Sequence, residues 1–391
     1  NFGLGQSPFP VPVPVVEALR LHAHEKEYLP VKGLFPLKEA VAGFHRQKDL
    51  VEANADYVLV GPGSKELMFL LQLVFYGEII VPTPCWVSYV PQAQILGKRV
   101  SLLHTSFEDK WHIRADRLSE LLEGEKDTYR PRLLVLNYPG NPDGLTYTAN
   151  ELKEIAEVAR EYELILLSDE IYGQLHHRGG HVSVARFYPE GTIISSGLSK
   201  WCGAGGWRLG TFTFPQSLDW LMDAMAAVAS ETYTSVSAPI QYAAIEAFRG
   251  SMVIERYLWH ARRILSVLGQ KCYRMLSDAG VRLHSPEGAF YMFPDFSPFA
   301  IELAKKNIKT SKQLCEKLFQ ETAVAMLPGR VFERPCEELT ARISYINFSG
   351  SKSLAASETI AIHHELPAEF IQAHCEETLR GMEILTEWLT S

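Results

Sequence analysis

The middle of this sequence places polar residues soon after short apolar runs: Asn141, Asp169, Tyr172, Lys200 and Arg208. Together they offer an amide, a carboxylate, a phenol, an amine and a guanidinium. Each is weak evidence alone, because a loop asparagine or a single lysine is common in any protein. The set is more informative, since a lysine amine becomes a nucleophile and a base when a desolvated site lowers its pKa. We therefore expect these five residues to share one site.

Common signatures of nucleotide and metal sites are not met. Residues 61–66 and 203–208 are rich in glycine, but neither has a glycine at the last position of the dinucleotide fingerprint. After His24 and Glu25, Tyr28 stands where the zinc-protease motif has its second histidine. The sequence therefore predicts no metal site.

Short apolar runs alternate with helical patterns from about Tyr57 to Phe214. The runs predict strands at Tyr57–Val60, Ile79–Val81, Leu133–Leu136, Leu164–Leu167, Thr192–Ile194 and Thr211–Thr213, and the patterns predict helices at Ser64–Phe75, Trp86–Gly97 and Asn150–Tyr162. Apolar strands alternating with amphipathic helices indicate an α/β fold, with a mostly parallel sheet sandwiched by helices. Ligand residues of such sheets follow the carboxyl ends of strands, where the five polar residues fall.

A region of different texture follows a long helix predicted at Glu255–Asp278. Strands near Ala289–Phe293 and Arg342–Ile346 and a last helix at about Pro367–Leu389 predict a smaller α+β domain. We place the large domain at 15–268 and build the small one from both chain ends, 1–14 and 269–391. The opening segment is expected to be an extended arm because it carries four prolines: Pro8, Pro10, Pro12 and Pro14.

Composition excludes several classes of protein. The chain has 391 residues, and its 47% hydrophobic and 21% charged residues are typical of an ordinary folded protein. The net charge of −8 argues against nucleic-acid binding, and no apolar run is long enough to span a membrane. No targeting leader is visible. Six scattered cysteines without a C-x-x-C motif indicate free thiols in a reducing compartment, so we expect a cytoplasmic protein.

The motifs around the five polar residues resemble those of class I/II aminotransferases, the pyridoxal 5'-phosphate enzymes of fold type I that include aspartate aminotransferase. The resemblance covers Gly5 to about Tyr345. Asp169 follows Asn141 by 28 residues and Arg208 follows Lys200 by 8, as in that family. The resemblance implies a pyridoxal-phosphate cofactor and small-molecule amino acid and 2-oxo acid substrates.

The resemblance also implies roles for the central residues. Lys200 resembles the lysine that forms the Schiff base with the cofactor and later moves a proton. Asp169 resembles the carboxylate that pairs with the pyridine nitrogen, so that the ring accepts electrons. Tyr172 and Asn141 resemble the donors to the phenolic oxygen of the ring. Trp86 resembles the aromatic residue that stacks on the ring.

Cofactor phosphate binding is implied for Gly63, Ser64 and Lys65, where a strand turns into a helix whose amide groups suit a dianion. Arg208 would add a two-pronged contact.

The chain departs from the family pattern three residues before Lys200, where many members have a phosphate-binding serine or threonine and this chain has Gly197. We expect Ser196 or Ser199 to compensate.

A homodimer with shared active sites is implied by Tyr28. With Gly33, it resembles the segment whose tyrosine reaches the phosphate in the neighbouring subunit. Thr234 and Ser235 resemble a second contact of that kind.

Substrate binding is implied for Arg342, which resembles the arginine that grips the α-carboxylate. Gly5 resembles the glycine of a mobile N-terminal lip, and Phe290 an aromatic beside the carboxylate site. Trp86 and Asn141 would also contact the substrate. Lys65 occupies the position that one subgroup uses for the distal carboxylate of aspartate or glutamate, but a solvated lysine at a helix start is an equal alternative.

The resemblance thus implies an aminotransferase of L-amino acids and 2-oxo acids that works through a Lys200 Schiff base, with the aspartate/glutamate type as one option. The alternative is a C–S lyase or another β-eliminating enzyme on the same fold, because Lys200, Asp169 and Arg342 serve both reactions. The segment 346–367 is expected to be a longer loop than relatives have there.

Overall fold

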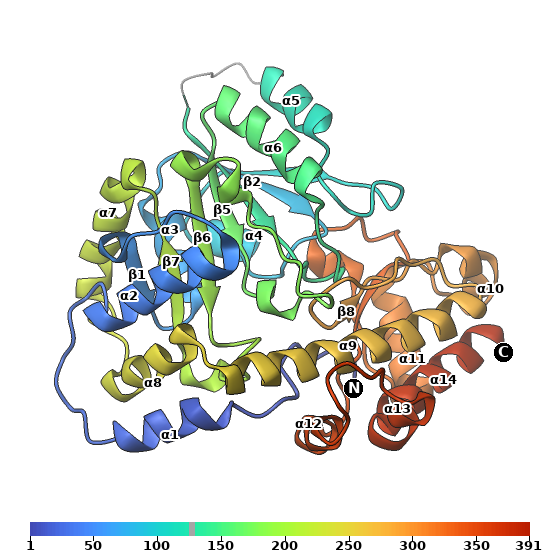
Figure 1. The fold of residues 1–391 in the computed structure, drawn as a ribbon. Helices are drawn as coiled ribbons and strands as arrows, with labels where there is room; N and C mark the ends of the chain where they lie inside the picture. The colour runs from blue at the N-terminus through green and yellow to red at the C-terminus, as the bar shows by residue number, and fades with distance from the viewer. Residues whose placement is uncertain (125–129) are drawn as a thin grey trace.

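A computed structural model describes residues 1–124 and 130–391 and shows a large and a small β-sheet surrounded by helices (Figure 1). The large sheet has the strand order β1-β7-β6-β5-β4-β2-β3. Its strands are β1 (Val58–Gly61), β2 (Glu78–Thr83), β3 (Val100–His104), β4 (Arg132–Asn137), β5 (Ile165–Asp169), β6 (Thr192–Gly197) and β7 (Gly210–Thr213). All neighbouring strands are parallel except β7, which is antiparallel to both β1 and β6. The predicted mostly parallel sheet is confirmed.

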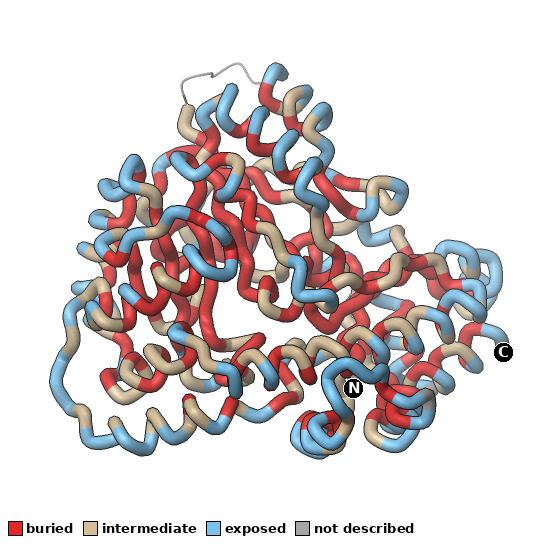
Figure 2. Tube along the Cα trace, viewed as in Figure 1, coloured by how far each residue is buried: buried red, intermediate tan, exposed pale blue. Residues whose placement is uncertain are grey.

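Helices cover both faces of this sheet. The helices are α1 (Val13–Leu21), α2 (Phe35–Phe44), α3 (Ser64–Val74), α4 (Tyr89–Ile95), α5 (Ala115–Glu123), α6 (Ala149–Glu161), α7 (Asp219–Glu231) and α8 (Ala238–Arg249). In β2, Ile79 and Val81 pack with residues of α3, α4 and α7, whereas Ile80 packs with residues of α5 and α6. Figure 2 shows the buried strands enclosed between helices whose outer faces are exposed. This alternation explains why the strands are apolar throughout.

The small unit contains an antiparallel sheet with the order β8-β10-β9. Its elements are β8 (Tyr291–Met292), α10 (Ala300–Lys305), α11 (Ser311–Thr322), β9 (Leu327–Pro328), β10 (Ala341–Ser344), α12 (Gly350–Glu358), α13 (Ala368–His374) and α14 (Glu376–Thr390). The N-terminal residues join it, because Phe2 bonds through its backbone to Ala325 and Ser344. Helix α9 (Met252–Asp278) runs along both units (Figure 1). The α+β unit built from both chain ends is confirmed, and the domain boundaries stay a prediction.

Several local predictions were wrong. The proline-rich opening is not extended throughout, since α1 begins at Val13 with Pro14 in its first turn. Proline is tolerated there because the first amides of a helix have no partner within it. The segment 346–367 contains α12, and the expectation that it has more loop than relatives have there stays a prediction. The last helix is two helices, which meet at Cys375 in a non-helical conformation (φ −133°).

Strand β3 was missed because most of its residues are only partly buried and give no continuous apolar run. Among the described residues, no helix combines the length and the apolar character that crossing a membrane requires. All six cysteines are free, and only Cys336 is exposed.

Candidate active site

The carboxyl edge of the large sheet gathers the predicted site residues. Asp169 is the last residue of β5, and Lys200 follows the neighbouring strand β6 by three residues. The Lys200 ammonium nitrogen lies 5.4 Å from the centre of the Tyr172 ring. Arg342 reaches the same place from β10 and donates a hydrogen bond to Asn141 Oδ1 (2.9 Å). Residues separated by 201 positions in the sequence thus meet at one edge.

Asp169 is buried and fixed by two hydroxyl groups. Tyr89 Oη donates to one carboxylate oxygen (2.6 Å) and Ser195 Oγ donates to the other (3.2 Å). Burial raises the pKa of Asp169 to about 6, although these hydrogen bonds act in the opposite direction. No cation forms an ion pair with this carboxylate among the described residues, so a buried anion stands ready for a cationic partner.

Lys200 has the lowered pKa that a nucleophilic amine needs. Burial and then the positive charge of Arg342 lower the pKa of Lys200 to about 8, while Asp169 opposes the shift. Its ammonium group donates to the carbonyl oxygen of Gly5 (2.6 Å). Near neutral pH an appreciable fraction of this amine is unprotonated, which an ordinary lysine does not provide.

The site also contains two tyrosines, Tyr89 and Tyr291, that the sequence analysis did not name. Tyr291 forms a hydroxyl–hydroxyl hydrogen bond with Tyr172 (2.8 Å) and lies beneath the guanidinium of Arg342, 4.6 Å from its ring centre. Tyr89 is the Asp169 donor described above. Each neighbours a motif used in the prediction, Phe290 and Trp86 respectively, but only the fold shows where its hydroxyl points.

The N-terminal lip lies inside the site. Arg342 donates to the carbonyl oxygen of Gly3 (2.6 Å), and its Nε atom is buried without a hydrogen-bond partner in the described chain. A side chain at Gly5 would collide with the hydroxyl of Tyr291. The lip can therefore occupy this position only if residue 5 is glycine. Its carbonyl oxygens accept hydrogen bonds from Lys200 and Arg342, and these donors could bind an anion if the lip moved away.

A helix start and a guanidinium converge at the other end of the site. Gly63 precedes α3 with φ 93°, and a side chain there would collide with the guanidinium of Arg208. Ser64 is the first residue of α3. Lys65 is exposed, and its ammonium lies 5.1 Å from the ring centre of Trp86. Arg208 is exposed and donates to the carbonyl oxygens of Gly205 and Pro62. With the first amide groups of α3, which have no partner within the helix, its guanidinium forms a suitable cradle for a phosphate group.

Steric crowding explains why residue 197 is glycine. It pairs with Gly210 across β6 and β7, and a Cβ atom at residue 197 would lie 2.8 Å from the carbonyl oxygen of Leu209. A serine or threonine would not fit without moving β7. Ser196 is buried and Ser199 half-buried beside this position, and a compensating role for either stays a prediction.

The residues predicted to serve a neighbouring subunit lie outside this cluster. Tyr28 is 90% exposed in the single chain, and Thr234 is exposed as well. Ser235 is half-buried, and no hydrogen bond joins its side chain to the central residues. Gly33 has φ 108° and lies against Val60 and Gln241. A role at a partner's site stays a prediction for all four.

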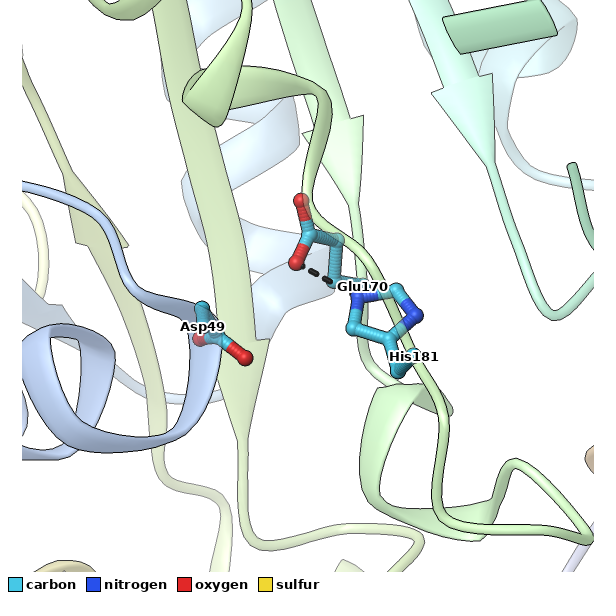
Figure 3. Close-up of side chains that lie close together, drawn as sticks. All are labelled: Asp49, Glu170 and His181. Atoms are coloured by element: carbon cyan, nitrogen blue, oxygen red, sulfur yellow. Dashed lines mark hydrogen bonds and ion pairs between the residues drawn. The ribbon is translucent and has the colours of Figure 1, made fainter. Parts of the chain in front are cut away.

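A buried ionic cluster lies behind Asp169. Figure 3 shows Glu170 bonded to His181 and Asp49 approaching from the N-terminal segment. One ligand-type atom from each residue lies within 4.8 Å of the others. Burial alone would lower the pKa of His181, but Glu170 and, less strongly, Asp49 raise it. Glu170 also accepts hydrogen bonds from Ser168 and Ser183, and its contact with His181 (2.8 Å) helps to fix the turn that follows β5.

Comparison with known proteins decides the family. Residues 1–354 match the family model described as aminotransferase class I and II. The chain belongs to this family. An aspartate aminotransferase of Bacillus sp. (strain YM-2) is 31% identical to this aminotransferase over 327 residues, 82% of this chain and 79% of the relative. An aspartate/prephenate aminotransferase of Thermus thermophilus is 30% identical over 333 residues, 84% and 82% of the two chains.

Solved structures of aminotransferases have a similar fold. A tetra mutant of Thermus thermophilus aspartate aminotransferase has a TM-score of 0.83 at 26% identity and covers 99% of this chain and 95% of its own. An aromatic aminotransferase from Pyrococcus horikoshii has a TM-score of 0.82 at 27% identity, with coverage of 99% and 95%. The family uses pyridoxal phosphate.

The residues of this aminotransferase fit that cofactor. Among the described residues, the site combines an anion without an ion-pair partner (Asp169) with an amine of lowered pKa (Lys200). The charges of Arg208 and Lys65 also act on Lys200, and Lys65 lies beside the flat indole of Trp86. The anion, the amine, the indole and the Arg208 guanidinium match a pyridinium nitrogen, an aldehyde, a planar ring and a phosphate, in that order.

The electrostatics predict how Arg342 controls Lys200. Replacing Arg342 with Ala should raise the pKa of Lys200 from about 8 towards its usual 10.5, because the variant loses a nearby positive charge and admits water. The pH dependence of Lys200 acylation in the cofactor-free protein, followed by peptide mass spectrometry, measures this pKa. Arg330→Ala, an exposed arginine elsewhere in the chain, is the matched control. An unchanged or lower pKa in Arg342→Ala would contradict this electrostatic account.

Proposed function

We propose that this aminotransferase moves an amino group from an L-amino acid to a 2-oxo acid, with Lys200 as the residue that binds pyridoxal phosphate covalently. The observation that supports this most directly is the pair of Lys200 and Asp169 at the carboxyl ends of adjacent parallel strands. When bound, the cofactor supplies an electron-poor ring that stabilises negative charge at the substrate Cα atom.

The chain's own residues hold the cofactor at both ends. The Asp169 carboxylate, held by Tyr89 and Ser195, would pair with the ring nitrogen and keep it protonated. Tyr172 and Asn141 would donate to the phenolic oxygen. Trp86 would stack on one face of the ring, because a flat indole gains contact area there without covering the reacting face.

The phosphate group would be bound at the other end of the site by the start of α3 at Gly63 and Ser64, together with Lys65, Ser199 and the Arg208 guanidinium. Backbone amides and cations at this point match a dianion in both direction and charge.

Arg342 would orient the substrate. Its guanidinium binds the carbonyl oxygen of Gly3 in the present arrangement, so an incoming α-carboxylate would displace the lip and take up these donors and the unpartnered Nε. The pairing of an arginine with a carboxylate is two-pronged and fixes the substrate in one plane. Asn141, already bonded to Arg342, holds the guanidinium in place.

Lys200 would then move the proton. Its unprotonated amine would accept the proton of the substrate Cα atom and later give it up again, so that Lys200 ends the half-reaction in its starting protonation state. Return of the Gly5 segment over the site would exclude bulk water, which keeps the amine desolvated.

Aspartate or glutamate is the substrate class that we propose. Relatives at 30–31% identity include aspartate aminotransferases, and Lys65 is exposed at the mouth of the site beside Trp86. The Lys65 ammonium is the cation available there for a distal carboxylate. We propose a homodimer because Tyr28 is largely exposed in the single chain, where it could contact the phosphate site of a second subunit.

Replacing Lys200 with Arg tests the proposed reaction. The variant keeps the charge but loses the titrating amine, so transamination of aspartate with 2-oxoglutarate should fall about 10³-fold or more, since a positioned proton-transfer group contributes about 10²–10⁴-fold. Lys312→Arg, at an exposed residue of α11, should leave the rate unchanged. Wild-type enzyme that releases pyruvate from cysteine without needing a 2-oxo acid would instead indicate the β-eliminating alternative.

Replacing Lys65 with Ser tests the substrate class. The ratio of kcat/KM for aspartate to that for alanine should fall about tenfold to a hundredfold, because one charge-assisted hydrogen bond contributes about 1.5–3 kcal/mol. Taking the ratio cancels any effect on the cofactor phosphate. If both substrates lose equally, Lys65 does not read the distal carboxylate.

Replacing Tyr28 with Phe tests the shared site. Cofactor-free enzyme should then bind pyridoxal phosphate several-fold more weakly, because one hydrogen bond to the phosphate is lost. Tyr76→Phe is the control, since Tyr76 is 72% exposed elsewhere on the surface. Unchanged affinity, or a monomer in sedimentation at working concentration, would remove this assignment.

A further inference from the structure

A hollow of about 810 Å³ opens on the surface between α9 and the segment that follows α12. Its remaining walls come from the loop after β5 (His177, Arg178 and Gly179) and from residues of α13 and α14. None of the proposed catalytic residues lines it, so it is separate from the candidate active site. Its volume falls in the range of small-molecule binding sites, about 300–1,000 Å³.

The lining of this hollow is strongly cationic. Five of the described lining residues are permanently or usually positive: Arg178, Arg262, Arg263, Lys271 and Arg274. His177, His363 and His364 add further nitrogen donors, and Glu365 is the one acidic residue among the described lining residues. This excess runs against a chain whose overall charge is −8.

Three of these cations are free to bind a ligand. Arg178, Lys271 and Arg274 are exposed, and their side chains form no hydrogen bond or ion pair with other described residues. Some other surface arginines are paired, as Arg160 is with Glu190. Like charges that face one hollow without counterions raise its positive potential and favour an anion there.

The other two arginines shape the hollow. Arg263 donates to backbone carbonyl oxygens of Ser357, Ile360, Ala361 and His364, and its guanidinium lies 4.4 Å from the Trp259 ring centre. The segment after α12 is thereby fixed to α9. Arg262 donates to the carbonyl oxygen of Gln174 (2.6 Å) and fixes the loop after β5 in the same way. The walls are thus held in place before any ligand arrives, which lowers the entropy cost of binding.

We propose that this hollow binds a small, multiply charged anion of the polyphosphate class. Three cations from two separate segments suit a ligand with several anionic groups better than a single phosphate. A concave site of this size, on a chain with net negative charge, suits a compact ligand and not the extended backbone of a nucleic acid.

Titration calorimetry with inorganic tripolyphosphate tests this proposal. The enzyme is first saturated with pyridoxal phosphate, so that the candidate phosphate cradle of the active site is filled. We expect one site per chain, with an affinity that weakens as salt is added, because the contacts are ionic. The triple variant Arg178→Ser, Lys271→Ser, Arg274→Ser should bind at least tenfold more weakly and keep the wild-type turnover.

A matched variant distinguishes binding in the hollow from nonspecific electrostatic attraction of the anion to the protein surface. Arg186→Ser, Arg249→Ser, Lys305→Ser removes the same charges from exposed residues that do not line the hollow, and it should bind as the wild type does. The single variant Lys271→Glu should also weaken binding, which guards against a folding defect in the triple variant. Three outcomes would overturn the proposal. One is an equal loss of affinity in both triple variants, and another is tighter binding of a single-stranded oligonucleotide than of tripolyphosphate. The third is no binding by the wild type at about 1 mM tripolyphosphate, which is on the order of ordinary metabolite levels.

Discussion

The burial of two opposite charges at one sheet edge is the constraint on which the rest of the structure depends. Desolvation pushes the pKa of Asp169 up to about 6 and that of Lys200 down to about 8. Both shifts cost folding free energy, because each disfavours the charged form of its group. A chain retains such groups where chemistry requires them, and here their pKa values approach each other around neutral pH.

The surrounding elements hold this pair in place. Strands β5 and β6 are parallel neighbours, so their ends bring Asp169 and the Lys200 segment together. Tyr89, the first residue of α4, fixes the carboxylate, and the Glu170–His181 pair fixes the turn behind it (Figure 3). The small sheet adds the candidate substrate-binding residue Arg342, which lies on β10. The N-terminal lip is hydrogen-bonded both to Arg342 and to the backbone of β10.

The fold class and most of the candidate site could be predicted from the sequence, because apolar strands and the residues after them follow local rules. Lys200, Asp169 and Arg342 belong to motifs of fixed spacing. Tyr89 and Tyr291 could not be found in this way, since their roles depend on which hydroxyl meets which partner after folding. The direction of β7 and the presence of α12 were also hidden, as short or serine- and glycine-rich segments carry little periodic signal.

The most direct measurement identifies the residue that carries the cofactor. Enzyme loaded with pyridoxal phosphate is reduced with borohydride, digested, and mapped by mass spectrometry for the pyridoxyl label. The account predicts one labelled peptide, modified at Lys200, because among the lysines of residues 1–124 and 130–391 only this amine combines a lowered pKa with a position opposite Asp169. A label on Lys65 or on any other lysine, or no label in an enzyme that still turns over, would contradict it.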